Sequence, residues 1–228
     1  NMSSRLVIAL GIAGCVITAG CDLSAGRMIG FGACISGMLL QRMDYSGKFF
    51  PDMQPLNVFV VALIAMLVCA AFGTVTGFFI AYLNVPPFIA TLAMMEIVYG
   101  IGLIVTNATP LGGYVEQYTN VSNGKFLGIN YLIWIAIIVA VITWFIFNMT
   151  RHGKYMYAIG GNPQAAEVAG VPVKATLILI YMKAAAMYGL AGFMLGAKAG
   201  GASVQTGYGY EMEAIAACTI GGVSVTGG

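Results

Sequence analysis

The sequence predicts an all-α fold, a polytopic transmembrane helical bundle. Sixty per cent of the residues are hydrophobic and only 8% are charged, whereas soluble domains carry roughly 25% charged residues. In addition, several apolar segments approach the ~20 residues that a helix needs to cross a bilayer. We therefore expect an integral membrane protein that forms a single transmembrane domain over residues 1–228.

The apolar segments predict about six spanning helices. The first two are short and flank the polar stretch 22–27, so we expect broken or tilted helices there. Residues 198–228 are rich in glycine and too irregular for a helix that faces lipid, which favours a re-entrant segment that lines a pathway. Because the chain begins and ends abruptly in apolar sequence, we expect that a longer protein extends beyond both ends. The six segments are 6–20, 28–40, 56–83, 87–105, 131–147 and 175–197.

One polar run, residues 158–172, lies between two of these spans and predicts a short helix. Asn162 is a good helix N-cap and Pro163 suits the first helical position. Gly170 and Pro172 then end the helix after about two turns. The run therefore predicts a short helix at a membrane surface.

This short helix has the composition of a docking surface. Ala165 and Ala166 keep it thin enough to lie against a partner. Arg151, Lys154 and Lys174 surround it, and such a grouping of basic residues favours the cytoplasmic side. We expect a soluble partner beneath it.

Glycines recur at four-residue spacing in three apolar segments. This spacing lets helix backbones approach closely in a lipid environment. We therefore expect close helix packing at Gly26/Gly30, Gly73/Gly77 and Gly192/Gly196/Gly200.

Several classes of chemistry find no support in the residues. The five cysteines form no Cys-x-x-Cys pattern, and the single histidine, His152, cannot make a metal site by itself. No segment matches the phosphate-binding pattern of ATPases. A net charge of +2 gives no indication of nucleic-acid binding. We expect no catalytic and no metal-binding residues.

Charged and aromatic side chains in the apolar segments are the candidates for a substrate pathway. A charge at the bilayer centre costs ~2.5–3.5 kcal/mol, so each needs a partner, a cavity or an interfacial position. Asp22 either pairs with Arg27 or caps a helix that begins near Ser24; Glu96 forms an interhelical contact or a substrate contact. The aromatic residues could equally form an interfacial belt. The candidates are Asp22, Ser24, Phe88, Thr91, Glu96, Tyr208, Tyr210, Glu211 and Glu213.

Four runs together resemble the permeases of bacterial monosaccharide ABC importers, the ribose and galactose/methyl-galactoside group. Two further runs, Arg42-Met-Asp44 and Phe50-Pro-Asp-Met53, favour the galactoside branch. The four runs are Asp22-Leu-Ser-Ala-Gly26, Pro87-Phe-Ile-Ala-Thr-Leu92, Ile159-Gly-Gly-Asn-Pro-Gln-Ala-Ala166, and Glu211-Met-Glu-Ala-Ile-Ala-Ala217 followed by Ile220-Gly-Gly222.

The resemblance implies a homodimeric translocation subunit in the bacterial cytoplasmic (inner) membrane, in contact with lipid. Cytoplasmic ABC ATPase subunits and a periplasmic or lipid-anchored sugar-binding protein would be its partners. ATP and Mg²⁺ would then belong to the ATPase, and this chain would hold no cofactor. The implied ATPase-coupling residues are Gly160, Gly161, Asn162, Pro163, Ala165, Ala166, Glu167 and Gly170.

Two other function classes remain as alternatives. An ion-coupled secondary transporter could use Glu96, Glu211 or Glu213 as proton or sodium sites. A membrane-embedded enzyme would need a clustered nucleophile and base, which the sequence does not show.

Overall fold

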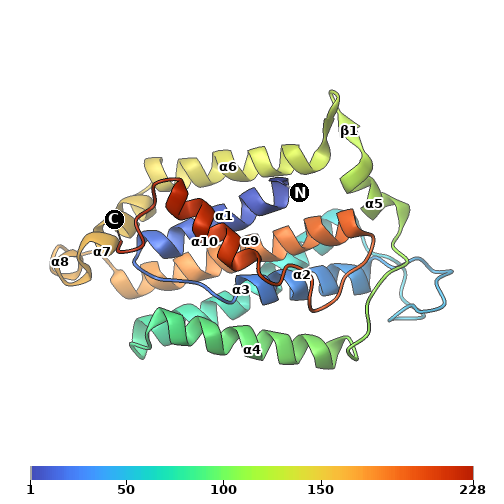
Figure 1. Ribbon diagram of the computed structural model, residues 1–228, viewed down its shortest axis with the longest axis horizontal. Helices are drawn as coiled ribbons and strands as arrows, with labels where there is room; N and C mark the ends of the chain where they lie inside the picture. The colour runs from blue at the N-terminus through green and yellow to red at the C-terminus, as the bar shows by residue number, and fades with distance from the viewer. Residues whose placement is uncertain (1, 228) are drawn as a thin grey trace.

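A computed structural model describes residues 2–227 as a bundle of helices with one short β-hairpin (Figure 1). The predicted transmembrane bundle is confirmed, but the predicted count of about six spans is not. Within residues 2–227, four helices are long and apolar enough to cross a membrane: α3 (Val58–Tyr82), α4 (Pro87–Val105), α6 (Tyr131–Met149) and α9 (Val173–Ala199).

The first two apolar segments form helices that are too short to cross alone. Helix α1 (Met2–Ile17) has 16 residues and α2 (Ala25–Leu39) has 15. At a rise of 1.5 Å per residue, each measures about 23 Å, against a hydrocarbon core of about 30 Å. Between them the backbone turns at Ala19, which has a left-handed φ of 55°. Gly20 is needed there because a Cβ atom would lie 2.5 Å from the Tyr181 hydroxyl of α9.

Helix α9 is the centre of the bundle. Of the most apolar 18-residue stretch of α9, 56% is buried within the bundle. The corresponding stretches of the other three long helices are 17–28% buried. Helices α1, α2 and α3 pack around it, as Figure 1 shows. Because α9 is covered on most sides, it needs no polar face of its own.

Close packing at the predicted glycines is confirmed for most of them. A Cβ atom at Gly77 of α3 would lie 2.7 Å from Ile178 Cα of α9, and one at Gly192 of α9 would lie 2.8 Å from Ala33 N of α2. Gly200 is an exception, because it ends α9 in a left-handed conformation (φ 67°) and a Cβ atom there would touch nothing.

The bundle has two distinct ends (Figure 1). One end carries α7 (Arg151–Gly161), α8 (Pro163–Val168) and the turn between α3 and α4. The other end carries the loop 40–57 and a group of short elements. Buried Gln41 ties the loop 40–57 to the segment before α5, because its Nε2 donates to Gly112 O (3.0 Å) and its Oε1 accepts from Phe49 N (2.7 Å). The short elements are α5 (Glu116–Asn123), β1 (Lys125–Phe126) and β2 (Ile129–Asn130).

The glycine-rich segment after α9 does not cross the bundle as a full helix. Residues 200–209 turn back and pack on α2, where a Cβ atom at Gly30 would lie 2.7 Å from Val204 O. Helix α10 (Tyr210–Ile220) follows and packs on α1. Its 11 residues span about 16 Å, so the irregular segment that the sequence predicts is partly a short, non-spanning helix.

Candidate functional site

The short helix predicted between two spans is present as α8, and its ends are fixed by the residues that the sequence indicates. Asn162 Oδ1 accepts a 2.9 Å hydrogen bond from Ala165 N, and Pro163 is the first helical residue. Gly170 has a left-handed φ of 82°, which suits glycine at a helix end. Helix α8 therefore has a defined residue at each end, and α9 begins at Val173, a few residues later.

A second helix, α7, precedes α8 and was not predicted. Thr150 caps it by accepting from Gly153 N (3.4 Å). Gly160 and Gly161 are its last two residues, so these two predicted coupling residues belong to α7 and not to α8. The two helices pack on each other and project from one end of the bundle (Figure 1).

The sequence predicts that Ala165 and Ala166 of α8 lie against a partner, but only one of these two alanines is exposed. Ala166 is buried, at 5% exposure, and therefore packs against the chain itself. Val168 is 91% exposed, a large value for a branched apolar side chain. Glu167, Pro163 and Ala165 are also exposed. The side chains available to a partner are therefore Val168 and its exposed neighbours, and Val168 was not among the predicted residues.

Asp22 binds Ser24, the residue that precedes α2, and does not pair with Arg27. Its Oδ1 accepts from Ser24 N (3.0 Å) and Ser24 Oγ (2.6 Å), and its Oδ2 accepts from Tyr188 Oη (3.1 Å). Asp22 is only 1% exposed and Ser24 is fully buried. Asp22 therefore orients Ser24, the N-cap residue of α2, and its carboxylate accepts no hydrogen bond from the first turn of that helix. The contact with Tyr188 also anchors the break between α1 and α2 to α9.

Arg27 is instead the centre of a polar and aromatic cluster that the sequence analysis missed. Its guanidinium carbon lies 4.0 Å from the ring centre of Tyr99 and 4.2 Å from that of Tyr208. Its Nη1 donates to Gln205 Oε1 (2.7 Å), and Gln205 Nε2 donates to Tyr99 Oη (3.1 Å). We call Arg27, Tyr99, Gln205 and Tyr208 the Arg27 cluster. It joins α2, α4 and the segment before α10.

Glu211 adds a carboxylate beside this cluster. Its side chain lies against Gly26, the neighbour of Arg27, and is 5% exposed. Glu211 Oε2 and Arg27 Nε are both buried without a hydrogen-bond partner within residues 2–227. Two charged groups of opposite sign therefore retain unused hydrogen-bonding capacity.

Glu213 and Tyr210 lie apart from Glu211, on the side of α10 that faces α1. Arg5 forms an ion pair with Glu213 (3.1 Å), and its guanidinium carbon lies 5.2 Å from the Tyr210 ring centre. These two predicted pathway residues thus contact Arg5 and hold α10 to α1.

Glu96 is exposed near the middle of α4. Phe88, on the same helix, is 57% exposed. By contrast, Thr91 is buried and donates to Cys21 O (3.1 Å), which ties α4 to the break between α1 and α2. Of the predicted pathway residues, the structure gathers Tyr208 and Glu211 around the Arg27 cluster and leaves Glu96 on an open helix face.

Residues 2–227 contain no group of three or more histidine, cysteine, aspartate or glutamate side chains that could hold a metal. The cysteines are free, and four of the five are buried.

Comparison with known proteins agrees with this architecture. The sequence matches the family described as branched-chain amino acid transport system / permease component over residues 2–228. The galactose/methyl galactoside import permease protein MglC of Haemophilus influenzae is 43% identical over 99% of this chain and 69% of its own length. For MglC of Escherichia coli the identity is 42% over the same shares.

The ribose import permease protein RbsC of Escherichia coli is 32% identical over 99% of this chain and 68% of its own length. The comparison with solved structures gave no significant match. The family match covers almost the whole chain, and the relatives are permeases rather than enzymes. This multi-pass membrane protein therefore belongs to the permease component family of branched-chain amino acid transport systems, in the part of it that includes sugar import permeases.

Proposed function

We propose that this chain is the translocation subunit of an ATP-driven importer of a monosaccharide, with galactose or methyl galactoside as the first candidates and ribose as the next. The order follows the similarities, because the MglC proteins share 42–43% of aligned residues with this chain and RbsC shares 32%. The comparisons give no support to an ion-coupled transporter.

The observation that carries this proposal within the structure is the exposed α8. A helix with both ends fixed presents Val168, at 91% exposure, at one end of the membrane bundle. An apolar side chain that is so exposed beside charged Glu167 suits a protein contact. We assign this surface to cytoplasmic ABC ATPase subunits, which would bind ATP and Mg²⁺, so that this chain needs no cofactor of its own.

The coupling between ATPase binding and permease conformation follows from thermodynamic linkage. An ATPase can change the conformation of the permease only if it binds the outward-open and inward-open states with different affinity. Helix α8 connects through α7 to α6 and leads directly into the central helix α9. A displacement of α8 would therefore act on the helix that contacts most of the bundle.

We assign the substrate pathway to the Arg27 cluster, Glu211 and the open face of α4. Aromatic faces combined with a few convergent polar groups are typical of ligand sites. Glu96 supports this assignment, because a charge near the middle of a span costs ~2.5–3.5 kcal/mol unless water or a polar partner meets it. A second copy of the chain would enclose this face, so that a homodimer would surround the pathway.

The remaining partners follow from the same family. A periplasmic or lipid-anchored sugar-binding protein would deliver the sugar at the end that carries α5 and the hairpin. The end with α7 and α8 would then face the cytoplasm across the bacterial inner membrane. Arg151, Lys154 and Lys174 lie at that end, which agrees with the preference of basic residues for the cytoplasmic side.

The test is co-purification of the full-length permease with its ATPase. Val168→Arg should abolish the association and leave the bundle folded, because the side chain contacts little of its own chain. Met43→Arg is the matched control, since Met43 is also exposed (54%) but lies at the opposite end. Retained association in Val168→Arg would contradict the assignment of α8, and absence of association in the wild type would contradict the proposed function.

A further inference from the structure

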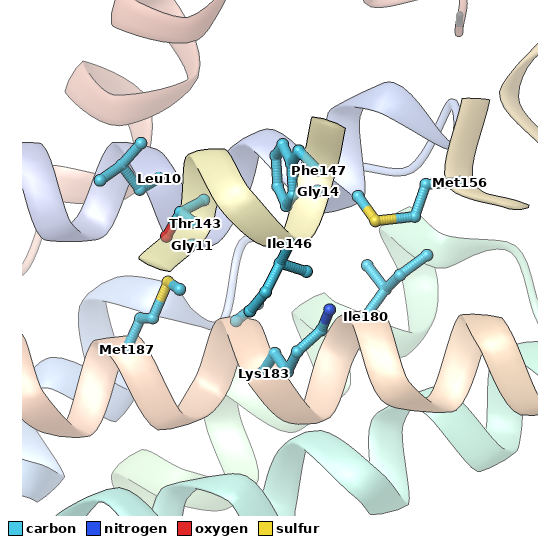
Figure 2. A pocket seen from close by; sticks show the side chains of 11 residues that line it. Leu10, Gly11, Gly14, Thr143, Ile146, Phe147, Met156, Ile180, Lys183 and Met187 are labelled. Atoms are coloured by element: carbon cyan, nitrogen blue, oxygen red, sulfur yellow. The ribbon is translucent and has the colours of Figure 1, made fainter. Parts of the chain in front are cut away.

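Lys183 stands out because it is a charged side chain in an apolar part of the bundle. It projects from α9 toward α6, between Ile146 and Ile180, into a small cavity that α1, α6, α7 and α9 enclose (Figure 2). The cavity is partly open and has a volume of about 20 Å³, room for about one water molecule. The side chain is half-buried, and it forms no ion pair or hydrogen bond with residues 2–227.

No acidic side chain is available to neutralise Lys183 locally. None of the four helices that surround it contains aspartate or glutamate. Arg151 and Lys154, both exposed on α7, add two more positive charges at the same end of the bundle. His152 lies between them in the sequence, and its Nε2 is buried without a partner in the described part of the chain. The region therefore has an excess of positive charge that no carboxylate of these four helices offsets.

The surroundings of Lys183 show what kind of anion would meet it. Among the four long helices of residues 2–227, α6 is the least covered, with 17% of its apolar stretch buried, so its outer face is free to contact lipid. Phe147, which lines the cavity, lies in the last turn of α6, whose end at Met149 marks the membrane boundary. Lys183 is the eleventh of the 27 residues of α9, but its amine lies beside the last turns of α6. A lysine side chain there extends its amine toward the headgroup level while its stem stays in apolar surroundings.

From this geometry we infer that the junction of α1, α6, α7 and α9 binds the headgroup of an anionic phospholipid, with Lys183 as the main contact to the phosphate. The cavity is too small for an acyl chain. The phosphate would therefore lie across its mouth, and the acyl chains would follow the exposed face of α6. Arg151 and Lys154 would add attraction from the surface, as basic residues beside a membrane helix do. This inference does not depend on the transported substrate.

Trp144 supplies a local probe. It is on α6, one turn before the end, and is 56% exposed. Brominated lipids quench tryptophan that they touch, so quenching of Trp144 compares the lipids at this junction. The signal of Trp144 is obtained as the difference between protein with this residue and the same protein carrying Trp144→Phe.

The experiment compares brominated phosphatidylglycerol with brominated phosphatidylcholine in vesicles that contain the full-length protein. One lysine near the surface contributes an attraction that corresponds to about a fivefold preference for the anionic lipid. We expect this preference in the wild type and its loss in Lys183→Met, which keeps a long apolar side chain. Lys174→Met is the matched control, because Lys174 is on the same helix but its amine lies over the Tyr82 ring (5.1 Å).

Three outcomes would overturn the inference. An equal preference in the wild type and Lys183→Met would show that Lys183 does not hold the lipid. A loss of quenching when inorganic phosphate is added at low millimolar concentration would assign the site to a free anion. Quenching of Trp144 by neither lipid would show that protein, and not lipid, covers this face.

Discussion

The hydrogen bond between Tyr188 and Asp22 allows a direct test of how the break between α1 and α2 is held. Tyr188 Oη donates to Asp22 Oδ2 over 3.1 Å, and the two residues are 0% and 1% exposed. Tyr188→Phe removes the donor and keeps the ring. A buried acceptor that loses its partner costs about 1–3 kcal/mol. Since 1 kcal/mol shifts the melting temperature of a chain of this size by about 2–4 °C, we expect a decrease of about 2–12 °C.

Tyr181 provides a matched control on the same helix. It is 1% exposed, but its hydroxyl has no hydrogen-bond partner within residues 2–227. Tyr181→Phe therefore removes an unpaired polar atom, and we expect an unchanged or higher melting temperature. Circular dichroism of both variants in the same detergent measures the difference. Equal losses would refute the reasoning, because they would show that the hydrogen bond to Asp22 does not distinguish the two hydroxyls.

Two further perturbations test the packing and the electrostatics by thermal unfolding. Gly192→Ala should destabilise by about 1–3 kcal/mol, because its Cβ would lie 2.8 Å from Ala33 N of α2; Gly100→Ala in α4, where a Cβ atom would touch nothing, should be neutral or stabilising, and the opposite order would contradict the packing. Burial and then the positive charge of Lys183 lower the pKa of His152 to about 4. The unfolded chain therefore binds a proton near pH 6.5 that the folded protein binds only near pH 4, so the melting temperature should fall as the pH falls across this range. His152→Gln should weaken that dependence, and an identical pH profile would argue against it.

Local signals account for the parts of the fold that the sequence predicts well. A cap, a proline and a terminal glycine act within a few residues, so the ends of α8 could be predicted from Asn162, Pro163 and Gly170. Helix α7 was missed because its polar and glycine-rich composition resembles a loop. The burial of Ala166 and the exposure of Val168 depend on how α8 packs on α7 and α9, which no local pattern shows.

The candidate pathway depends on contacts between residues that are distant in the sequence. Arg27 lies against Tyr99 and Tyr208, which are 72 and 181 positions away in the chain, and only the fold brings them together. The acidic residues could be identified as unusual from their apolar surroundings alone. Their partners could not be identified. The sequence left two roles open for Asp22, and in the structure Asp22 contacts Ser24 and Tyr188 and does not pair with Arg27.

Uptake of labelled galactose into proteoliposomes tests the central claim most directly. The vesicles would contain the full-length permease, its ATPase and the sugar-binding protein, with ATP enclosed on the ATPase side and ionophores present to collapse proton and sodium gradients. The account predicts uptake that requires ATP and persists without ion gradients. Uptake that needs an ion gradient and proceeds without ATP would contradict it.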